Sequence, residues 1–269
     1  MTNSYQGFLW MYHTWKQIEQ LDPDKTIFVI PTGAIEQHGP HLPVDTDIFN
    51  ANKIAEFVGK KDDVKNVIVM PPIWWGTSPH HKGYPGTLSL RLETFYYLLK
   101  DLIESVKIHG FYRFLIINGH GGNAGILTAA TSQINYDLGL SIPSFSYWQS
   151  IQKVLVAIGE SPIGGMGHAC EMETSLALFL RPELVNKKEI KADLPEPGIA
   201  WSCIDFRASG FLGIPLDFKR DSKEGVMGDP TFATAEKGKI IFDAACEAAS
   251  VVITDLAKLK REKFATDRF

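Results

Sequence analysis

The chain has 269 residues, of which 45% are hydrophobic and 22% charged, with a formal net charge of −4. This composition is typical of a folded globular protein and excludes a disordered chain. The slightly acidic balance argues against nucleic acid or an anionic membrane surface as the main partner, and no apolar run approaches the roughly 18 residues that span a bilayer.

The three cysteines, Cys170, Cys203 and Cys246, are scattered and form no CxxC pair. This number and spacing favour neither a disulfide framework nor a thiolate zinc site. The first residues lack the basic segment and the long apolar stretch of a signal peptide. We therefore expect a cytoplasmic protein without a nucleic-acid or membrane partner.

Apolar runs alternate with amphipathic stretches, which is the pattern of strands and helices around a mostly parallel sheet. Buried strands are predicted at residues 26–31, 66–70 and 114–117, with a weaker one at 142–147, where Pro143 permits only a strand start or an edge strand. Apolar residues repeating at the helical period predict helices at 48–57, 92–108, 123–138 and 233–258. We expect a single α/β domain over residues 1–269.

Residues 184–230 break this alternation with several prolines and glycines. They also contain large apolar side chains that need to be buried, namely Trp201, Phe206, Phe211, Leu212 and Phe218. An irregular segment of this length inside a compact domain usually covers a site or forms a contact surface.

The segment 31–47, which follows the first predicted strand, contains Glu36, His38, His41, Asp45 and Asp47 among glycines and prolines. Such a segment forms a shaped loop, and α/β sheets bind ligands at the carboxyl ends of their strands. Carboxylates and imidazoles converging there suit zinc, manganese or iron(II). The alternative is a polar loop whose carboxylates cap the helix that begins near residue 48.

A glycine-rich turn, NGHGGN at residues 118–123, follows the third predicted strand. Its glycines let the backbone approach a ligand closely, and His120 is its one side chain with real affinity for a metal ion. A phosphate site is the alternative, but the turn lacks the lysine of a P-loop and does not match GxGxxG.

Two further segments contribute titratable side chains. His168, Glu171 and Glu173 precede an apolar run at 176–180, and taken alone they are more typical of an acidic helix start. His168 and Glu173 can meet only if that helix begins after His168. Residues 80–90, with His81 and several aromatics and glycines nearby, suit either a pocket wall or a mobile surface loop.

In order along the chain, these segments resemble the motifs of the creatininase (creatinine amidohydrolase) family. The matching segments are GAIEQHGPHLP at 33–43, YPGTLSL at 84–90, NGHGGN at 118–123, ETS at 173–175 and GDP at 228–230. The resemblance covers about residues 25 to 240. It implies a three-layer α/β/α fold with a mostly parallel central sheet, a small-molecule substrate, a homohexamer and two adjacent divalent metal ions (zinc, manganese or iron).

Carried over by position, the resemblance implies that Glu36 and His120 bind one metal ion. It likewise implies that His38 binds the other ion and that Asp47 bridges the two. His168 matches the catalytic histidine of the family.

The residues expected to contact the substrate are Trp148, His81, Gly121 and Gly122. Creatininase itself has a tyrosine and a metal-binding glutamate where this chain has Gly121 and Gly122, so creatinine is not the expected substrate. Glu173 is the candidate replacement ligand and is also counted among the catalytic residues. The Gly-Gly form is similar to branches that include a formamidopyrimidine deformylase, a peptide-cleaving enzyme of redox-cofactor maturation and a hydrolase of cyclic inositol-derived ketones.

The implied activity is metal-assisted hydrolysis that opens a cyclic amide or cleaves a formamide or other non-peptide C–N bond, with a water activated by the two ions. His168 would move a proton to the leaving group. The alternatives are hydrolysis of a cyclic non-amide substrate, such as an inosose-type ring ketone or a lactone, and a metal-binding protein without turnover. A serine hydrolase is disfavoured because GxSxG is absent from the sequence.

Overall fold

The structure is a computed structural model of the chain and describes residues 7–61, 64, 66–194, 204–208 and 212–266. The strands are β1 (Ile27–Thr32), β2 (Val67–Val69), β3 (Phe114–Asn118), β4 (Ser144–Ser146), β5 (Met166–His168) and β6 (Met227–Gly228). The α-helices are α1 (Trp15–Glu19), α2 (Thr46–Lys60), α3 (Leu92–Lys107), α4 (Asn123–Leu138), α5 (Tyr147–Ser150), α6 (Gln152–Ile158), α7 (Glu171–Leu180), α8 (Phe218–Asp221) and α9 (Ala235–Lys258).

The main sheet is a four-stranded parallel sheet in the order β2-β1-β3-β4. β1 and β3 are buried along their whole length, which is why they read as continuous apolar runs in the sequence. β4 is an edge strand, as Pro143 requires, and the carbonyl of Pro143 accepts a hydrogen bond from the N–H of Ile116 at 3.0 Å. The predicted strands are confirmed, with ends shifted by one or two residues.

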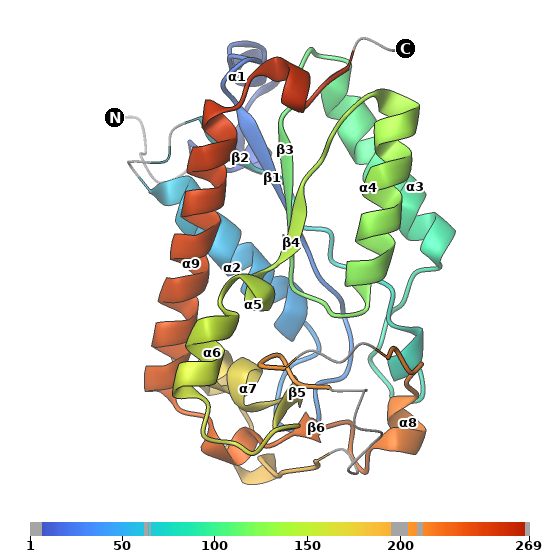
Figure 1. Ribbon diagram of the computed structural model, residues 1–269, viewed down its shortest axis with the longest axis vertical. Coiled ribbons are helices and arrows are strands. Elements are labelled where there is room, and N and C mark those ends of the chain that lie inside the picture. Colours follow the sequence, from blue (N-terminus) through green and yellow to red (C-terminus); the bar gives the residue numbers. More distant parts are fainter. Residues whose placement is uncertain (1–6, 62–63, 65, 195–203, 209–211, 267–269) are drawn as a thin grey trace.

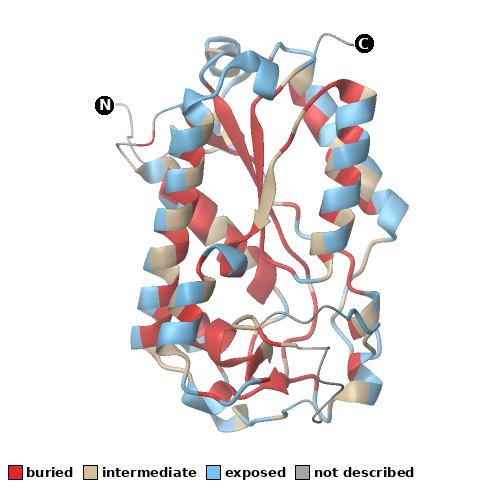
Figure 2. Ribbon diagram, in the orientation of Figure 1, coloured by how far each residue is buried: buried red, intermediate tan, exposed pale blue. Residues whose placement is uncertain are grey.

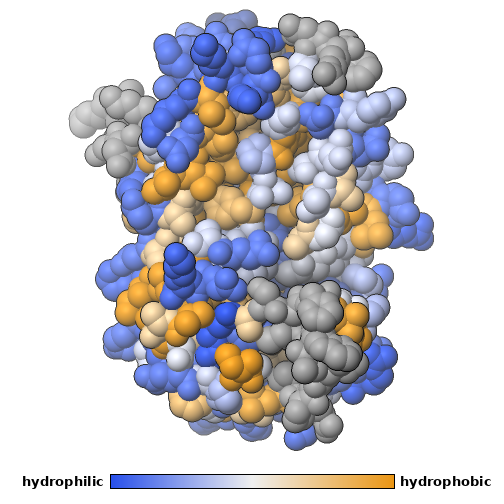
Figure 3. Space-filling model, in the orientation of Figure 1, coloured by the Kyte–Doolittle hydropathy of each residue, from blue (hydrophilic) through white to orange (hydrophobic). Residues whose placement is uncertain are grey.

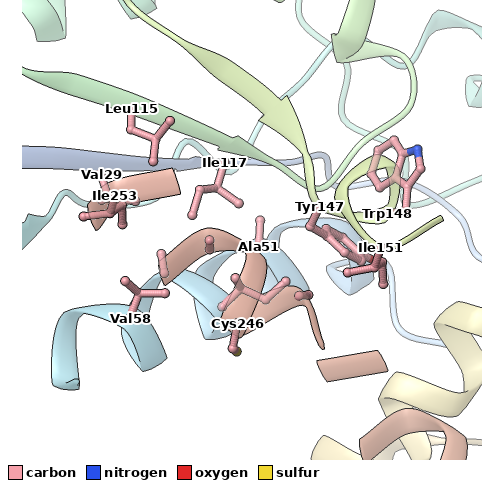
Figure 4. Close-up of a cluster of buried hydrophobic side chains, with 14 of the residues drawn as sticks. Val29, Ala51, Val58, Leu115, Ile117, Tyr147, Trp148, Ile151, Cys246 and Ile253 are labelled. Atoms are coloured by element: carbon pink, nitrogen blue, oxygen red, sulfur yellow. The ribbon is translucent and has the colours of Figure 1, made fainter. Parts of the chain in front are cut away.

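Helices cover both faces of this sheet, α2 and α9 on one side and α3 and α4 on the other (Figure 1). Successive side chains of a strand therefore enter different cores. In β1, Val29 packs in the core formed with α2 and α9, while Phe28 and Ile30 pack in the core formed with α3 and α4. Figure 4 shows Leu115 and Ile117 of β3 pointing into the first of these cores. The predicted three-layer α/β/α fold is confirmed, with the buried sheet between two half-exposed helical layers (Figure 2).

The segment 184–230 contains only short elements among its described residues. One of them, β6, pairs with β5 to form a second, antiparallel sheet. Phe206 and Phe218 line a cavity at the carboxyl end of the main sheet, whereas Trp201 and Phe211 lie outside the described residues. The expectation that Leu212 is buried is wrong, since this residue is 40% exposed. The described parts of this segment therefore help to enclose that end of the molecule.

Among the described residues, no helix has both the length and the apolar character needed to cross a bilayer. On the face shown in Figure 3, hydrophilic and apolar side chains are interspersed, and apolar surface is visible beside α9.

α7 and α9 are held together by a close backbone approach and a buried ion pair. An added Cβ at Gly238 of α9 would lie 2.0 Å from the carbonyl oxygen of Ser175 in α7, so glycine is required at this separation. One residue earlier, Nζ of Lys237 lies 2.6 Å from Oε1 of Glu171, whose side chain is fully buried. These contacts fix the first turn of α7, which also carries Glu173.

We expect Lys237→Met to lower the free energy of unfolding by about 3 kcal/mol, because the substitution removes the cation beside the buried carboxylate of Glu171 and leaves it only the backbone N–H groups of Glu160 and Ser161. Urea unfolding at fixed protein concentration measures the loss. Lys239→Met is the matched control, since Lys239 pairs with Asp243 on the exposed side of the same helix. Equal stability of the two variants would contradict the importance of the buried pair.

Candidate metal centre

Loops at the carboxyl ends of β1 and β3 meet the first turns of α2 and α7 in one buried cluster. Glu36 and His38 follow β1, and His120 follows β3. Asp47 lies in the first turn of α2 and Glu173 in that of α7. Each of these side chains belongs to a residue that is at most 5% exposed. The structure therefore brings together the five residues that the sequence analysis assigned to metal binding after the family resemblance.

Asp47 lies at the centre of the cluster, between two imidazole rings. Its Oδ1 is 3.1 Å from Nε2 of His38, and its Oδ2 is 2.9 Å from Nδ1 of His120. Oε1 of Glu36 is 3.3 Å from the same nitrogen of His120. Oε1 of Glu173 is 3.7 Å from Nε2 of His38. The cluster thus has two halves that share Asp47, one with Glu36 and His120 and the other with His38 and Glu173.

The opposite nitrogen of each ring faces a backbone carbonyl oxygen, which can only accept a hydrogen bond. Nδ1 of His38 is 3.1 Å from the carbonyl oxygen of Glu36, and Nε2 of His120 is 3.2 Å from that of Thr77. Nitrogens in these positions carry the proton of a neutral ring, so the lone pairs turn towards the carboxylates. Acceptors then face acceptors, an arrangement that is repulsive unless a cation lies between them.

Two carboxylate oxygens, one of them the Oδ2 of Asp47 that faces His120, also indicate a cation. Among the described residues, Oε2 of Glu36 and Oδ2 of Asp47 are buried and have no hydrogen-bond partner, although a buried charged oxygen without a partner is costly. The ligand atoms of Glu36, His38 and Asp47 lie within 4.8 Å of one another, close enough to share an ion. Carboxylate and imidazole donors suit zinc, manganese or iron(II), so the residues present fit divalent cations.

The carboxylates also shift the pKa values of the rings. Burial lowers the pKa of His120, but Glu36 and Asp47 outweigh burial and raise the value to about 10. Burial likewise lowers the pKa of His38, which Asp47 and Glu173 nevertheless raise well above its ordinary range. Burial raises the pKa of Glu36, but neighbouring imidazoles, led by His120, hold it well below its ordinary value. The ionised carboxylates therefore require positive charge, which protons or a metal ion can supply.

His168 ends β5 and lies beside the cluster. α7 begins after this residue, which is the condition under which His168 and Glu173 can face the same point. Nε2 of His168 is 2.8 Å from the carbonyl oxygen of Gln37, and Nδ1 is 3.7 Å from Oε1 of Glu36. Burial, followed by the charge of His38, holds the pKa of His168 well below its ordinary value. The ring is therefore neutral, with the lone pair of Nδ1 turned inward.

A cavity of about 590 Å³ opens onto the cluster. The carboxylates and imidazoles form one part of its lining. The other part is mainly apolar and includes Trp148, Ile204, Phe206, Ile214, Pro215, Leu216 and Phe218, together with the charged residue Asp217. Trp148, which was expected to contact the substrate, packs against Phe206 with ring centroids 5.1 Å apart. No lysine or arginine is among the described residues that line the cavity.

Gly121 and Gly122, also expected at the substrate site, have different surroundings. An added Cβ at Gly122 would lie 2.4 Å from Nε2 of His120 and 2.5 Å from the carbonyl oxygen of Thr77, whereas a Cβ at Gly121 would meet no described atom within 4 Å. A glutamate at position 122 would therefore displace His120. The carboxylate that faces His38 comes instead from Glu173.

His41 and Asp45, which the sequence grouped with the metal-binding side chains, lie outside the cluster. Nε2 of His41 is 2.9 Å from Oγ1 of Thr174, and Asp45 forms an ion pair with Arg181 at 2.6 Å. The alternative role of Asp45 as a helix cap is also wrong, because its side chain makes no capping hydrogen bond at the start of α2. His41 instead ties the loop to Thr174 of α7, and Asp45 ties it to Arg181, the residue that follows α7.

Sequence reasoning missed the residues that hold the rings of the cluster in place. Oγ of Ser78 is 3.1 Å from Nε2 of His120, and Nε2 of Gln37 is 2.8 Å from Nδ1 of His81. The position of Gln37 inside the motif at 33–43 is a signal from which its role could have been found. Nothing in the spacing of Ser78 points to a histidine 42 residues away.

Comparisons with known proteins find similarity to one family. The family model of creatininase (creatinine amidohydrolase) matches residues 11–253. A mycofactocin precursor peptide peptidase of Mycolicibacterium smegmatis is 31% identical over 85% of this chain and 83% of its own length. A 3-dehydro-scyllo-inosose hydrolase of Thermotoga maritima is 30% identical over 95% of this chain and 83% of its own length. A crystal structure of creatinine amidohydrolase shares the fold, with a TM-score of 0.78 at 23% identity over 95% of this chain and all of the other.

We expect His120→Gln to weaken zinc binding by about 100-fold or more, because the substitution removes the nitrogen that faces both Glu36 and Asp47. Elemental analysis of the purified protein and competition with a chelator measure the change. His41→Gln is the matched control: this histidine is equally buried in the neighbouring loop but bonds to Thr174. Equal zinc contents in both variants would place the ion elsewhere.

Proposed function

This chain belongs to the creatininase family, and from this premise we propose that it is a divalent-metal-dependent hydrolase of a C–N bond. The observation that carries the proposal is the buried cluster around Asp47, in which acceptor atoms face one another and two carboxylate oxygens lack partners among the described residues. This cluster opens into a cavity large enough for a small organic substrate.

Two ions are proposed, and the two halves of the cluster support this number. Glu36 and His120 would hold one ion, His38 and Glu173 the other, and Asp47 would bridge them. Zinc and manganese are the first ions to test, because solved creatininases include a Zn–Zn form and an Mn form, and iron(II) suits the same donors. When bound, such ions lower the pKa of a water molecule and polarise the carbonyl of the substrate.

His168 is proposed as the group that moves the proton. Its Nε2–H is held by the carbonyl oxygen of Gln37, so the free lone pair of Nδ1 faces the cluster. In this orientation the ring can accept a proton from the attacking water and pass it to the departing nitrogen. Trp148 and Gly121, which has open space beside it, would leave room for the substrate. Glu173 would be a catalytic residue at the same site.

The substrate proposed is a cyclic amide, a formamide or another compound with a hydrolysable C–N bond. The apolar wall and the absence of lysine or arginine among its described residues favour an uncharged substrate over a phosphorylated one. The second candidate is a cyclic non-amide such as an inosose-type ring ketone, which the Thermotoga maritima relative supports because the match covers 95% of this chain.

We further propose that one domain over residues 1–269 forms a homo-oligomer, with a hexamer as the specific expectation, and that the protein works in the cytoplasm. The family resemblance supports the oligomer. Cys170 and Cys246 are unpaired, which is consistent with a reducing compartment.

The test is hydrolysis of a small panel by the zinc- or manganese-loaded protein, comprising cyclic amides, formamides, short peptides and inosose-type ketones. We expect turnover of a C–N substrate, with a new amino group that is either released or carried on the ring-opened product, loss of turnover after chelation, and its recovery when the metal is restored. Acid release from a ring ketone alone would favour the second candidate. Stoichiometric metal without turnover of any substrate would indicate a metal-binding protein.

His168→Ala should lower kcat by about 10²- to 10⁴-fold, the usual contribution of general acid–base catalysis, while the metal content stays at the wild-type level. Steady-state kinetics on the substrate found in the panel, with elemental analysis of the same sample, separates the two effects. Full activity in this variant would remove His168 from the mechanism. Loss of metal together with activity would make it a ligand.

A further inference from the structure

Gln37 lies between Glu36 and His38 in sequence, but its side chain turns away from both and is buried behind the cluster. Its Oε1 is 2.8 Å from the backbone nitrogen of Gly39, and its Nε2 is 2.9 Å from the carbonyl oxygen of Gly225. Nε2 is also 2.8 Å from Nδ1 of His81. The side-chain amide therefore joins the first motif to the loop before β6 and to His81.

These contacts leave only one orientation for the amide. If its oxygen and nitrogen exchanged places, an N–H would face the N–H of Gly39 and an oxygen would face the carbonyl oxygen of Gly225. In the observed orientation, one hydrogen of Nε2 goes to Gly225 and the other points to Nδ1 of His81. Nε2 also lies 3.1 Å from Nε2 of His168, but that nitrogen donates its own hydrogen to the carbonyl oxygen of Gln37 at 2.8 Å.

The orientation of Gln37 fixes the tautomer of His81. Since Nδ1 accepts a hydrogen bond from the amide, it carries no hydrogen, and the proton of the neutral ring is on Nε2. Nε2 of His81 is 3.2 Å from Oε1 of Glu36. A protonated nitrogen cannot bind a metal ion, so this ring donates to the carboxylate instead. His81 thus differs from His38, whose inward nitrogen bears the lone pair.

We propose that His81 is a positioning residue and not a metal ligand: held by Gln37 as the Nε2–H tautomer, it donates to Oε1 of Glu36 and orients that carboxylate. Oε2 of Glu36, which has no hydrogen-bond partner among the described residues, is then free to face the ion. The role towards an ion rests on the proposed function, whereas the tautomer follows from the hydrogen bonds alone.

His81 lines the cavity beside the cluster, and the rings packed against it hold its own ring in place. The residue is 1% exposed, and its ring packs against the rings of His168 and Phe218, with centroids 4.3 Å and 3.9 Å away. Glu36 and His81 could otherwise share an ion with His168, because their ligand atoms lie within 4.8 Å of one another. The amide of Gln37 is the feature that decides between these two possibilities.

The first arm of the test locates the proton. Neutron diffraction from deuterated crystals should show deuterium on Nε2 of His81 and none on Nδ1, with two deuterons on the amide of Gln37. Deuterium on Nδ1 would overturn the proposal whether or not the protein binds a metal. This arm therefore remains informative if the proposed hydrolase function fails.

The second arm compares two substitutions of His81 in the cobalt-loaded protein. His81→Gln keeps an N–H donor at about the position of Nε2, so we expect a cobalt absorption spectrum and an affinity within about threefold of wild type. His81→Leu removes the donor, and the affinity should fall by about 10- to 100-fold, as for other groups that orient a ligand. Thermal unfolding of both variants shows that the fold is retained.

Two results would contradict the positioning role. If His81→Gln changes the cobalt spectrum as much as His81→Leu does, the ring is a ligand, because an amide nitrogen does not replace an imidazole nitrogen. If His81→Leu binds cobalt like wild type, the ring only fills space. Wild-type protein that binds no cobalt would refute the proposed function and the role of His81 towards an ion, while the first arm would still decide the tautomer.

Discussion

The crowding of ionised carboxylates and imidazole lone pairs around Asp47 is the constraint on which the rest of the site depends. His38 and His120 commit their outer nitrogens to backbone carbonyl oxygens, so their inner nitrogens meet carboxylate oxygens at 2.9–3.1 Å. In a buried place this arrangement is stable only with added positive charge. The polar cluster therefore requires positive charge within it, from protons or from a metal ion.

The fold supplies this cluster through its topology. β1 and β3 are adjacent and parallel, so the loops that follow them emerge side by side. The backbone near Gly33 and Gly119 passes close to α2. An added Cβ at Gly33 would lie 2.5 Å from Cα of Ile48, and one at Gly119 would lie 2.2 Å from the carbonyl oxygen of Asp47. These glycines let the start of α2 bring Asp47 between the two loops.

The second half of the cluster depends on a different part of the chain. Gly122 leaves no room for a carboxylate beside His120, and Glu173 takes the place facing His38 from α7. The position of α7 is in turn fixed by its contact with α9 at Gly238 and by the ion pair of Glu171 with Lys237. The cavity beside the cluster has an open space at Gly121 and a largely apolar wall that also includes Asp217.

The sequence by itself determined the alternation of strands and helices, because hydrophobic periodicity is local. It also determined which segments carry donors, because glycines and titratable side chains cluster after the strands. Only the tertiary structure decided that His41 and Asp45 lie outside the cluster and contact Thr174 and Arg181. It likewise decided the proton positions of the rings, since each depends on a hydrogen-bond partner distant in sequence, such as Gly225 for Gln37. The local sequence pattern specifies the helices and strands, whereas the packing between them specifies which lone pairs of the side chains face one another.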